Sequence, residues 1–96
     1  MSMNFLVIED DADLRDAIVD FLAVRRHRVT ACGSIAEANV ALADLDQDRE
    51  VPDAIVSHIH LRDGDGMSFY IKASSRYPDV RWILTSPERE QQRVST

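Results

Sequence analysis

Three acidic residues follow directly on a short apolar segment near the start of the chain. Glu9, Asp10 and Asp11 come immediately after residues 5–8, Phe-Leu-Val-Ile. Crowded carboxylates repel one another, and a hard divalent cation such as Mg²⁺, which prefers oxygen ligands, relieves that repulsion. The sequence therefore predicts an acidic pocket formed by Glu9 and Asp10, with Mg²⁺ as its candidate ligand. Asp11 and Asp13 are instead predicted to cap the helix that follows.

His58 stands at the end of another apolar segment, residues 54–57. If the two segments are neighbouring strands, its imidazole lies opposite Glu9 and Asp10. A positive charge about 4 Å from a carboxylate gains a few kcal/mol at an effective dielectric constant of ~20, so we expect these acids to hold His58 as an imidazolium. Two other interpretations remain open, a histidine hydrogen-bonded to the backbone and a Zn²⁺ site built from Glu9, Asp10 and His58. His60 is predicted to lie in a loop.

Two hydroxyl residues, Thr85 and Ser86, follow the apolar segment 82–84. Ser86 fits the N-cap of a further helix with Pro87 at its first position, and this structural role is compatible with a functional one. The sequence contains no nucleophile with an adjacent base, no GxGxxG motif and no phosphate-binding P-loop. We therefore do not expect an enzyme.

These side chains must be positioned by the elements that precede them. Four apolar segments lie at 5–8, 29–32, 54–57 and 82–84. Each is typical of a strand buried on both faces, as in a parallel sheet. Amphipathic segments between them predict three helices, and the alternation predicts an α/β fold built from βαβ units. In such sheets ligands bind beyond the carboxyl ends of the strands, which is where Glu9, His58 and Ser86 stand.

The predicted helices have their own local signals. Leu14, Ile18, Phe21 and Leu22 recur with helical spacing and predict the buried face of the first helix. Ser34, followed three residues later by a glutamate, fits a capping box at the start of the second helix. Residues 61–66 are predicted to form a turn.

Composition limits the class of protein. The 96 residues are enough for one domain, and a hydrophobic content of 45% excludes a disordered tail. The 17 acidic and 11 basic residues give a net charge of −6, which disfavours direct binding of nucleic acid. The single cysteine, Cys32, is expected to be a small buried residue. No apolar segment is long enough for a signal peptide or a membrane span, so a cytoplasmic protein is expected.

Taken together, the segments 5–15, 52–67 and 77–86 resemble the receiver domains of response regulators. The resemblance implies a doubly wound, flavodoxin-like parallel sheet of strand order 2-1-3-4-5. It also implies transfer of a phosphoryl group from a sensor histidine kinase to an aspartate. By this resemblance, Glu9 and Asp10 match the acidic pair that binds Mg²⁺, and Ser86 matches the hydroxyl residue that senses the phosphoryl group.

Two features depart from the pattern of that family. His58 stands where the family has its phosphoacceptor aspartate, and an imidazole cannot supply an anionic oxygen ligand. Mg²⁺ binding is therefore expected to be weakened, and no cofactor is predicted. The family's fifth strand, with its lysine, and its fifth helix are missing. Residues 1–96 are thus predicted to form a single receiver-like domain, incomplete at the C-terminus, with strand order 2-1-3-4.

These features predict a degenerate receiver domain of two-component (phosphorelay) signalling that acts as a phosphorylation-independent interaction or regulatory module. The expected partner is a sensor histidine kinase or another signalling protein. The strand edge left by the missing elements predicts a homodimer or a module completed by a partner. Two alternative functions remain open. One is a phosphoryl-accepting fragment that uses His58 or a nearby acid, and the other is a small metal-binding protein with Glu9, Asp10 and His58.

Overall fold

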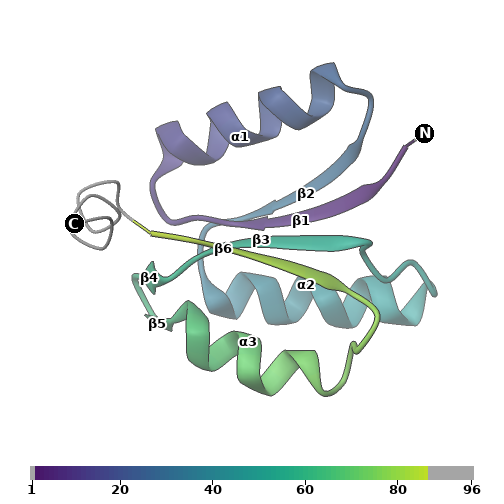
Figure 1. Cartoon of the computed structure of the whole chain (residues 1–96), viewed down its shortest axis with the longest axis vertical. Helices are drawn as coiled ribbons and strands as arrows, with labels where there is room; N and C mark the ends of the chain where they lie inside the picture. The colour runs from purple at the N-terminus through teal and green to yellow at the C-terminus, as the bar shows by residue number, and fades with distance from the viewer. Residues whose placement is uncertain (1, 87–96) are drawn as a thin grey trace, which may run out of the picture.

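The computed structural model describes residues 2–86, which form a four-stranded parallel sheet with helices on both faces (Figure 1). The elements in chain order are β1 (Asn4–Ile8), α1 (Ala12–Val24), β2 (Arg28–Cys32), α2 (Ile35–Gln47), β3 (Ala54–His58), β4 (His60–Leu61), β5 (Gly64–Asp65), α3 (Gly66–Ser74) and β6 (Arg81–Thr85). The strands of the main sheet lie in the order β2-β1-β3-β6. The predicted α/β fold and the strand order 2-1-3-4 are confirmed, since β6 is the predicted fourth strand. The further helix predicted from Pro87 onward lies outside the described residues.

The sheet separates two helical layers of unequal size. α1 covers one face, and α2 and α3 cover the other (Figure 1). The main core lies on the side of α2 and α3, where Leu6 and Ile55 of the sheet belong to one cluster with Leu42 of α2 and Phe69 of α3. Because both faces of the central strands are covered, β1 and β3 are apolar without a polar–apolar alternation.

The expected burial of α1 is only partly correct. Leu22 is buried and Ile18 is half-buried, but Leu14 is 44% and Phe21 is 56% exposed. Periodicity identifies the apolar side of a helix, whereas burial also requires a neighbouring element. α1 packs on β1 and β2, and among residues 2–86 the ring of Phe21 is contacted instead by the guanidinium of Arg25, 3.6 Å from its centroid.

Caps fix where the helices begin. The carboxylate of Asp11 accepts hydrogen bonds from the backbone N–H groups of Asp13 and Leu14, as expected of the α1 N-cap. The hydroxyl of Ser34 accepts from the N–H of Glu37 at the start of α2. The predicted capping box is incomplete, because the Glu37 carboxylate accepts from the N–H of Gly33 and not from that of Ser34.

The segment predicted as a simple turn forms a small antiparallel ribbon of β4 and β5. The end of the ribbon is tied to the residue that follows β3, because the N–H of Gly66 donates to the carbonyl of Ile59 at 2.6 Å. Asp63 lies in this ribbon's turn and accepts from the N–H groups of Ile35 and Ala36 at 2.9 and 3.0 Å. The ribbon therefore joins the end of β3 to the first turn of α2.

Two further expectations concern burial and membranes. Cys32 is buried at the end of β2, as predicted, and burial raises the pKa of its thiol to about 11. A thiol of this kind is largely unreactive at neutral pH. None of the helices within residues 2–86 has the length and hydropathy needed to cross a membrane.

Candidate functional site

The carboxyl ends of β1, β3 and β6 bring three polar side chains into one row. In the register of the sheet, Ile8 pairs with Ser57, and His58 pairs with Thr85. Glu9, the residue after Ile8, therefore falls beside His58, while Thr85 lies on the other side of the histidine. The strand register alone places these three side chains next to one another.

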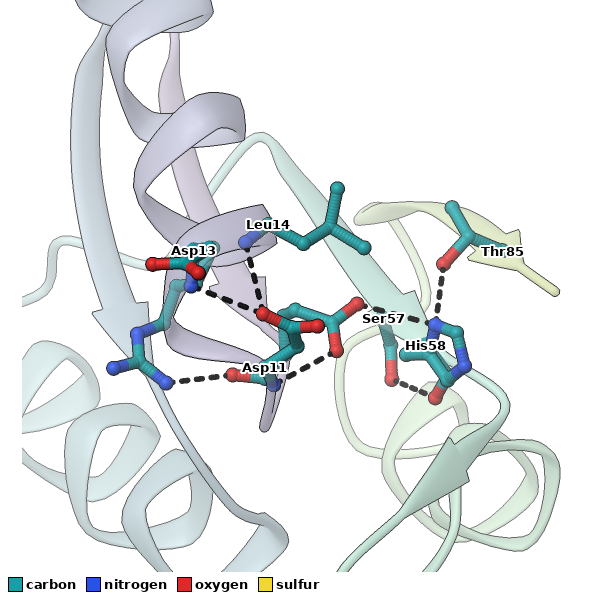
Figure 2. A network of polar contacts seen from close by, with 8 residues as sticks. Asp11, Asp13, Leu14, Ser57, His58 and Thr85 are labelled. Carbon is teal, nitrogen blue, oxygen red and sulfur yellow. Dashed lines mark hydrogen bonds and ion pairs between the residues drawn. The ribbon is translucent and has the colours of Figure 1, made fainter. Parts of the chain in front are cut away.

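His58 contacts both of its neighbours through a single nitrogen. Its Nδ1 lies 3.1 Å from Oε1 of Glu9 and 3.4 Å from Oγ1 of Thr85 (Figure 2). Both side chains are largely enclosed, with 16% of the His58 side chain and 3% of the Glu9 side chain exposed. An ionised carboxylate has no proton to give, so Nδ1 must carry the hydrogen when Glu9 is ionised. The arrangement is thus an ion pair whenever the imidazole is protonated.

Both oxygens of Glu9 are engaged. Oε1 faces His58, and Oε2 accepts a hydrogen bond from the N–H of Asp11 at 3.1 Å. Burial raises the pKa of Glu9 above its usual value, although the Asp11 N–H and the charge of His58 oppose the rise. The neighbouring Asp10 adds to the rise, because it lies close enough to hydrogen-bond to Glu9 and to repel its charge. Glu9 is therefore a desolvated carboxylate, and each of its oxygens already has one partner.

The other predicted site residues take different positions. Asp10 is half-buried beside Glu9, and no contact joins it to His58 in the described part of the chain. Ser86 is half-buried, and within residues 2–86 its hydroxyl has no hydrogen-bond partner. The hydroxyl that reaches His58 is that of Thr85. The strand continues to Thr85, and this one-residue extension brings Thr85 level with His58.

Two residues of the site had no role in the sequence analysis. The guanidinium of Arg15 donates to the backbone carbonyl of Glu9 at 2.8 Å. Its position one turn after the α1 N-cap, Asp11, is a spacing that points a long side chain back toward the strand end. The hydroxyl of Ser57, which is fully buried, donates to the carbonyl of His58 at 3.1 Å. These contacts hold the backbone on either side of the ion pair.

The residues at this edge bear differently on the two predicted cations. A Zn²⁺ site needs three or four side chains directed at one point, and within residues 2–86 no three histidine, cysteine, aspartate or glutamate side chains converge in this way. The geometry therefore does not support the Zn²⁺ site of Glu9, Asp10 and His58. Mg²⁺ is held by one or two carboxylates together with water, and the contacts of Glu9 with His58 and Asp11 leave Mg²⁺ binding by Glu9 and Asp10 a prediction.

Comparison with known proteins identifies the fold of this chain. No protein-family model and no curated protein matches the chain. Among solved structures, it is similar to the non-phosphorylated HemR receiver domain from Leptospira biflexa, with a TM-score of 0.74 and 22% identity over 95% of this chain and 72% of that one. A response regulator receiver domain protein from Clostridium thermocellum also has a TM-score of 0.74, with 18% identity over 88% of this chain and 64% of that one. The chain thus has the fold of response regulator receiver domains and spans about two thirds of their length.

Proposed function

We propose that this chain is a degenerate receiver domain of two-component signalling that works as a phosphorylation-independent interaction module in the cytoplasm. The observation that carries the proposal is the enclosed contact between His58 and Glu9 at 3.1 Å. The receiver-like fold supports the signalling context, and the contact supports the loss of phosphoryl chemistry. The expected partner is a sensor histidine kinase or another signalling protein.

The contact between His58 and Glu9 bears on both chemical requirements of phosphoryl transfer. Transfer depends on placing a nucleophile in line with the phosphorus and on neutralising the charge that develops on the phosphoryl oxygens. At this edge the Nδ1 of His58 is turned toward Glu9 and Thr85, and each oxygen of Glu9 already has a partner that a cation would have to compete with. Both requirements are compromised by the same side chain.

The same contact offers a reason for a fixed conformation. The imidazole joins the end of β1, through Glu9, to the end of β6, through Thr85. When it is protonated, His58 supplies the positive charge that an added cation would otherwise bring, and its contacts hold the three strand ends in one arrangement. A partner would recognise this single arrangement irrespective of any phosphoryl donor.

The test is the intact mass of the protein after incubation with acetyl phosphate and Mg²⁺, for the wild type, His58→Asp and His60→Asp. His60→Asp is the matched control, because it adds an aspartate two residues away at an exposed position. We expect no phosphoryl adduct on the wild type or on His60→Asp. A stoichiometric adduct on the wild type would overturn the proposal and favour the phosphoryl-accepting alternative at His58 or a nearby acid. An adduct on His58→Asp alone would show that position 58 by itself blocks the reaction.

We also infer that the chain forms a homodimer through β6. Among the described strands β6 lies at one edge of the sheet, and its Ile83 is 49% exposed. An outer strand with exposed apolar side chains tends to pair with another chain. Light scattering at tens of micromolar is expected to give the mass of a dimer, and Ile83→Lys is expected to give a monomer. Val40→Lys, at a position 63% exposed on α2, is the control. A monomeric wild type would contradict the inference.

A further inference from the structure

β6 has one side that is paired with β3 and one side that is not. The backbone N–H of Arg81 donates to the carbonyl of Asp53 at 3.1 Å, and the carbonyl of Thr85 accepts from the N–H of Ile59 at 2.8 Å. The N–H and C=O groups of one residue in a strand point to the same side, and those of successive residues point to opposite sides. The first, third and fifth residues of β6 therefore direct their backbone groups at β3.

The second and fourth residues of β6, Trp82 and Leu84, turn their backbone N–H and C=O groups to the outer edge of the sheet. Within residues 2–86 no strand pairs with this edge. Unpaired backbone groups on an edge strand are a template for pairing with another chain, and a second copy of β6 offers the same two residues. The positions of these groups determine how two copies can pair.

Two copies of β6 that are related by a twofold axis pair best in one register. Antiparallel strands form hydrogen bonds only where outward-pointing residues stand opposite each other. Trp82 can therefore stand opposite Trp82, Leu84 opposite Leu84, or Trp82 opposite Leu84 of the partner subunit. The last register forms twice as many hydrogen bonds within β6 as either of the others, because both outward residues of each copy take part. In that register all five residues of β6 are paired.

This register determines which side chains meet on each face of the sheet. The ring of Trp82 packs on that of Phe69, with 5.8 Å between the ring centroids, so Trp82 faces α3. Successive side chains alternate between the faces, and Arg81, Ile83 and Thr85 therefore lie on the side of the sheet where α1 lies. Ile83 then stands opposite Ile83 of the partner subunit as a non-hydrogen-bonded pair, the closer of the two kinds of pair. The exposed Ile83 side chains thus cover each other at the twofold axis.

The same register brings a cation from one copy to the site of the other. Arg81 stands opposite Thr85 of the partner subunit, and Thr85 is the outer end of the row that continues through His58 to Glu9. Arg81 is exposed, and no carboxylate pairs with it in the described part of the chain. Its guanidinium is therefore available to the site of the partner subunit.

We propose that two copies pair through β6 in this register, and that Arg81 of the partner subunit completes the row of Glu9, His58 and Thr85. The proposal rests on the homodimer through β6 that belongs to the proposed function, and it adds the register and the composite site. A guanidinium is charged at every physiological pH, whereas the imidazole of His58 is charged only when protonated. Each site then has a permanent positive charge that the other copy supplies, and a protein that binds at this site contacts both copies.

The first experiment maps the register with introduced cysteines under mild oxidation. Ile83→Cys is expected to form a covalent dimer, because the Cα atoms of a non-hydrogen-bonded pair lie about 4.5 Å apart and a disulfide needs roughly 4.4–6.8 Å. Arg81→Cys is the matched control on the same strand and face. Its two copies stand about 14 Å apart along the strand and should not cross-link, whereas Arg81→Cys mixed with Thr85→Cys should. The wild type should stay uncross-linked, because Cys32 is buried.

These outcomes separate the register from the dimer itself. A wild type that scatters light as a dimer while Ile83→Cys fails to cross-link would overturn the register and leave the dimer. Cross-linking of Arg81→Cys as efficient as that of Ile83→Cys would overturn it in the same way. A monomeric wild type would overturn both the register and the dimer.

A second experiment tests the contribution of Arg81 across the dimer. ¹⁵N-labelled wild type is mixed with an excess of unlabelled Arg81→Gln, so that most labelled chains pair with a subunit that lacks the guanidinium. The NMR signals of the His58 ring are expected to shift in this mixture. They should stay unchanged with an excess of unlabelled wild type or of Arg25→Gln, which loses the same charge on α1. If the mixture remains dimeric and the signals do not move with Arg81→Gln, or move equally with Arg25→Gln, the contribution of Arg81 is overturned.

Discussion

Replacing Gly66 by alanine tests whether the backbone packing behind His58 is as tight as the structure shows. Gly66 is buried at the start of α3. A Cβ at this position would lie 2.2 Å from the carbonyl oxygen of His58 and 3.1 Å from the Cα of Ile59, whereas Cβ contacts under 3.0 Å are essentially never seen. Both neighbours are backbone atoms, so no rotation of a side chain can relieve the clash. Either the end of β3 or the start of α3 must move.

The expected cost follows from three contributions. Overpacking a tight site costs about 1–3 kcal/mol. Weakening the hydrogen bond from the N–H of Gly66 to Ile59 costs about 1 kcal/mol more, while alanine regains at most about 1 kcal/mol of helix propensity. Gly66→Ala should therefore lower the free energy of unfolding by about 1–3 kcal/mol, out of the roughly 5–15 kcal/mol typical of a domain. For a chain of this size that corresponds to a fall in Tm of about 5–20 °C.

The assay is urea and thermal unfolding of Gly66→Ala beside Gly33→Ala. Gly33 is the matched control, because its added Cβ would meet only side-chain atoms, the Arg15 guanidinium at 3.0 Å and the Glu37 carboxylate at 3.4 Å, which can move. Gly33→Ala should remain within about 1 kcal/mol of the wild type. NMR signals of the His58 ring should shift more in Gly66→Ala than in Gly33→Ala. Equal stability of the two variants, with the His58 signals unchanged, would refute the reasoning.

Two further predictions have opposite dependence on pH. Because burial raises the pKa of Glu9, the folded state favours its protonated form, and stability is lost as the pH rises through the folded pKa. Glu9→Gln cannot titrate at this position, so its free energy of unfolding in urea, relative to that of the wild type, should rise from pH 4 to pH 7; a difference that does not change with pH would contradict this. The N–H groups of Ile35 and Ala36 lower the pKa of Asp63 below 3.8, so its contribution is present above that value and is lost as the pH falls through the folded pKa. Asp63→Asn should have a lower Tm at pH 7, with a gap that closes in acid; a gap independent of pH would point to a cause other than the carboxylate.

The order of elements could be predicted because strands buried on both faces have a distinctive composition. β1 and β3 read as uninterrupted apolar segments, and the caps at Asp11 and Ser34 marked the starts of two helices correctly. The exposure of Phe21 could not be predicted, since helical periodicity shows which side is apolar but not whether anything covers it. The ribbon of β4 and β5 was also missed, because two-residue strands are too short to leave a pattern.

The sequence predicted which strand ends carry the candidate site, but it did not predict every side chain that meets there. Glu9 and His58 both stand at carboxyl ends of parallel strands, and the topology alone brings them together. The choice between Thr85 and Ser86 depends on register, and a shift of one residue changes which side chain meets the histidine. Asp10 lies beside Glu9 but does not reach His58 in the described part of the chain, because successive side chains at a strand end diverge. Its place in the acidic pocket stays a prediction. The hydrogen bond from Arg15 to the carbonyl of Glu9 could not be predicted from the sequence, because it also depends on the path of α1.

The charge balance of the Glu9–His58 pair links the stability of the domain to its proposed loss of phosphoryl chemistry. A buried carboxylate without a partner costs several kcal/mol, and His58 supplies that partner from within the chain. An aspartate at position 58 would instead put a second carboxylate near the place where the imidazole nitrogen now lies 3.1 Å from Glu9, and like charges at that distance cannot both ionise without a cation between them. The side chain at position 58 therefore determines whether the charge of Glu9 is neutralised by the chain itself or by an ion from solution. The comparison of the wild type with His58→Asp is for that reason a test of function as well as of stability.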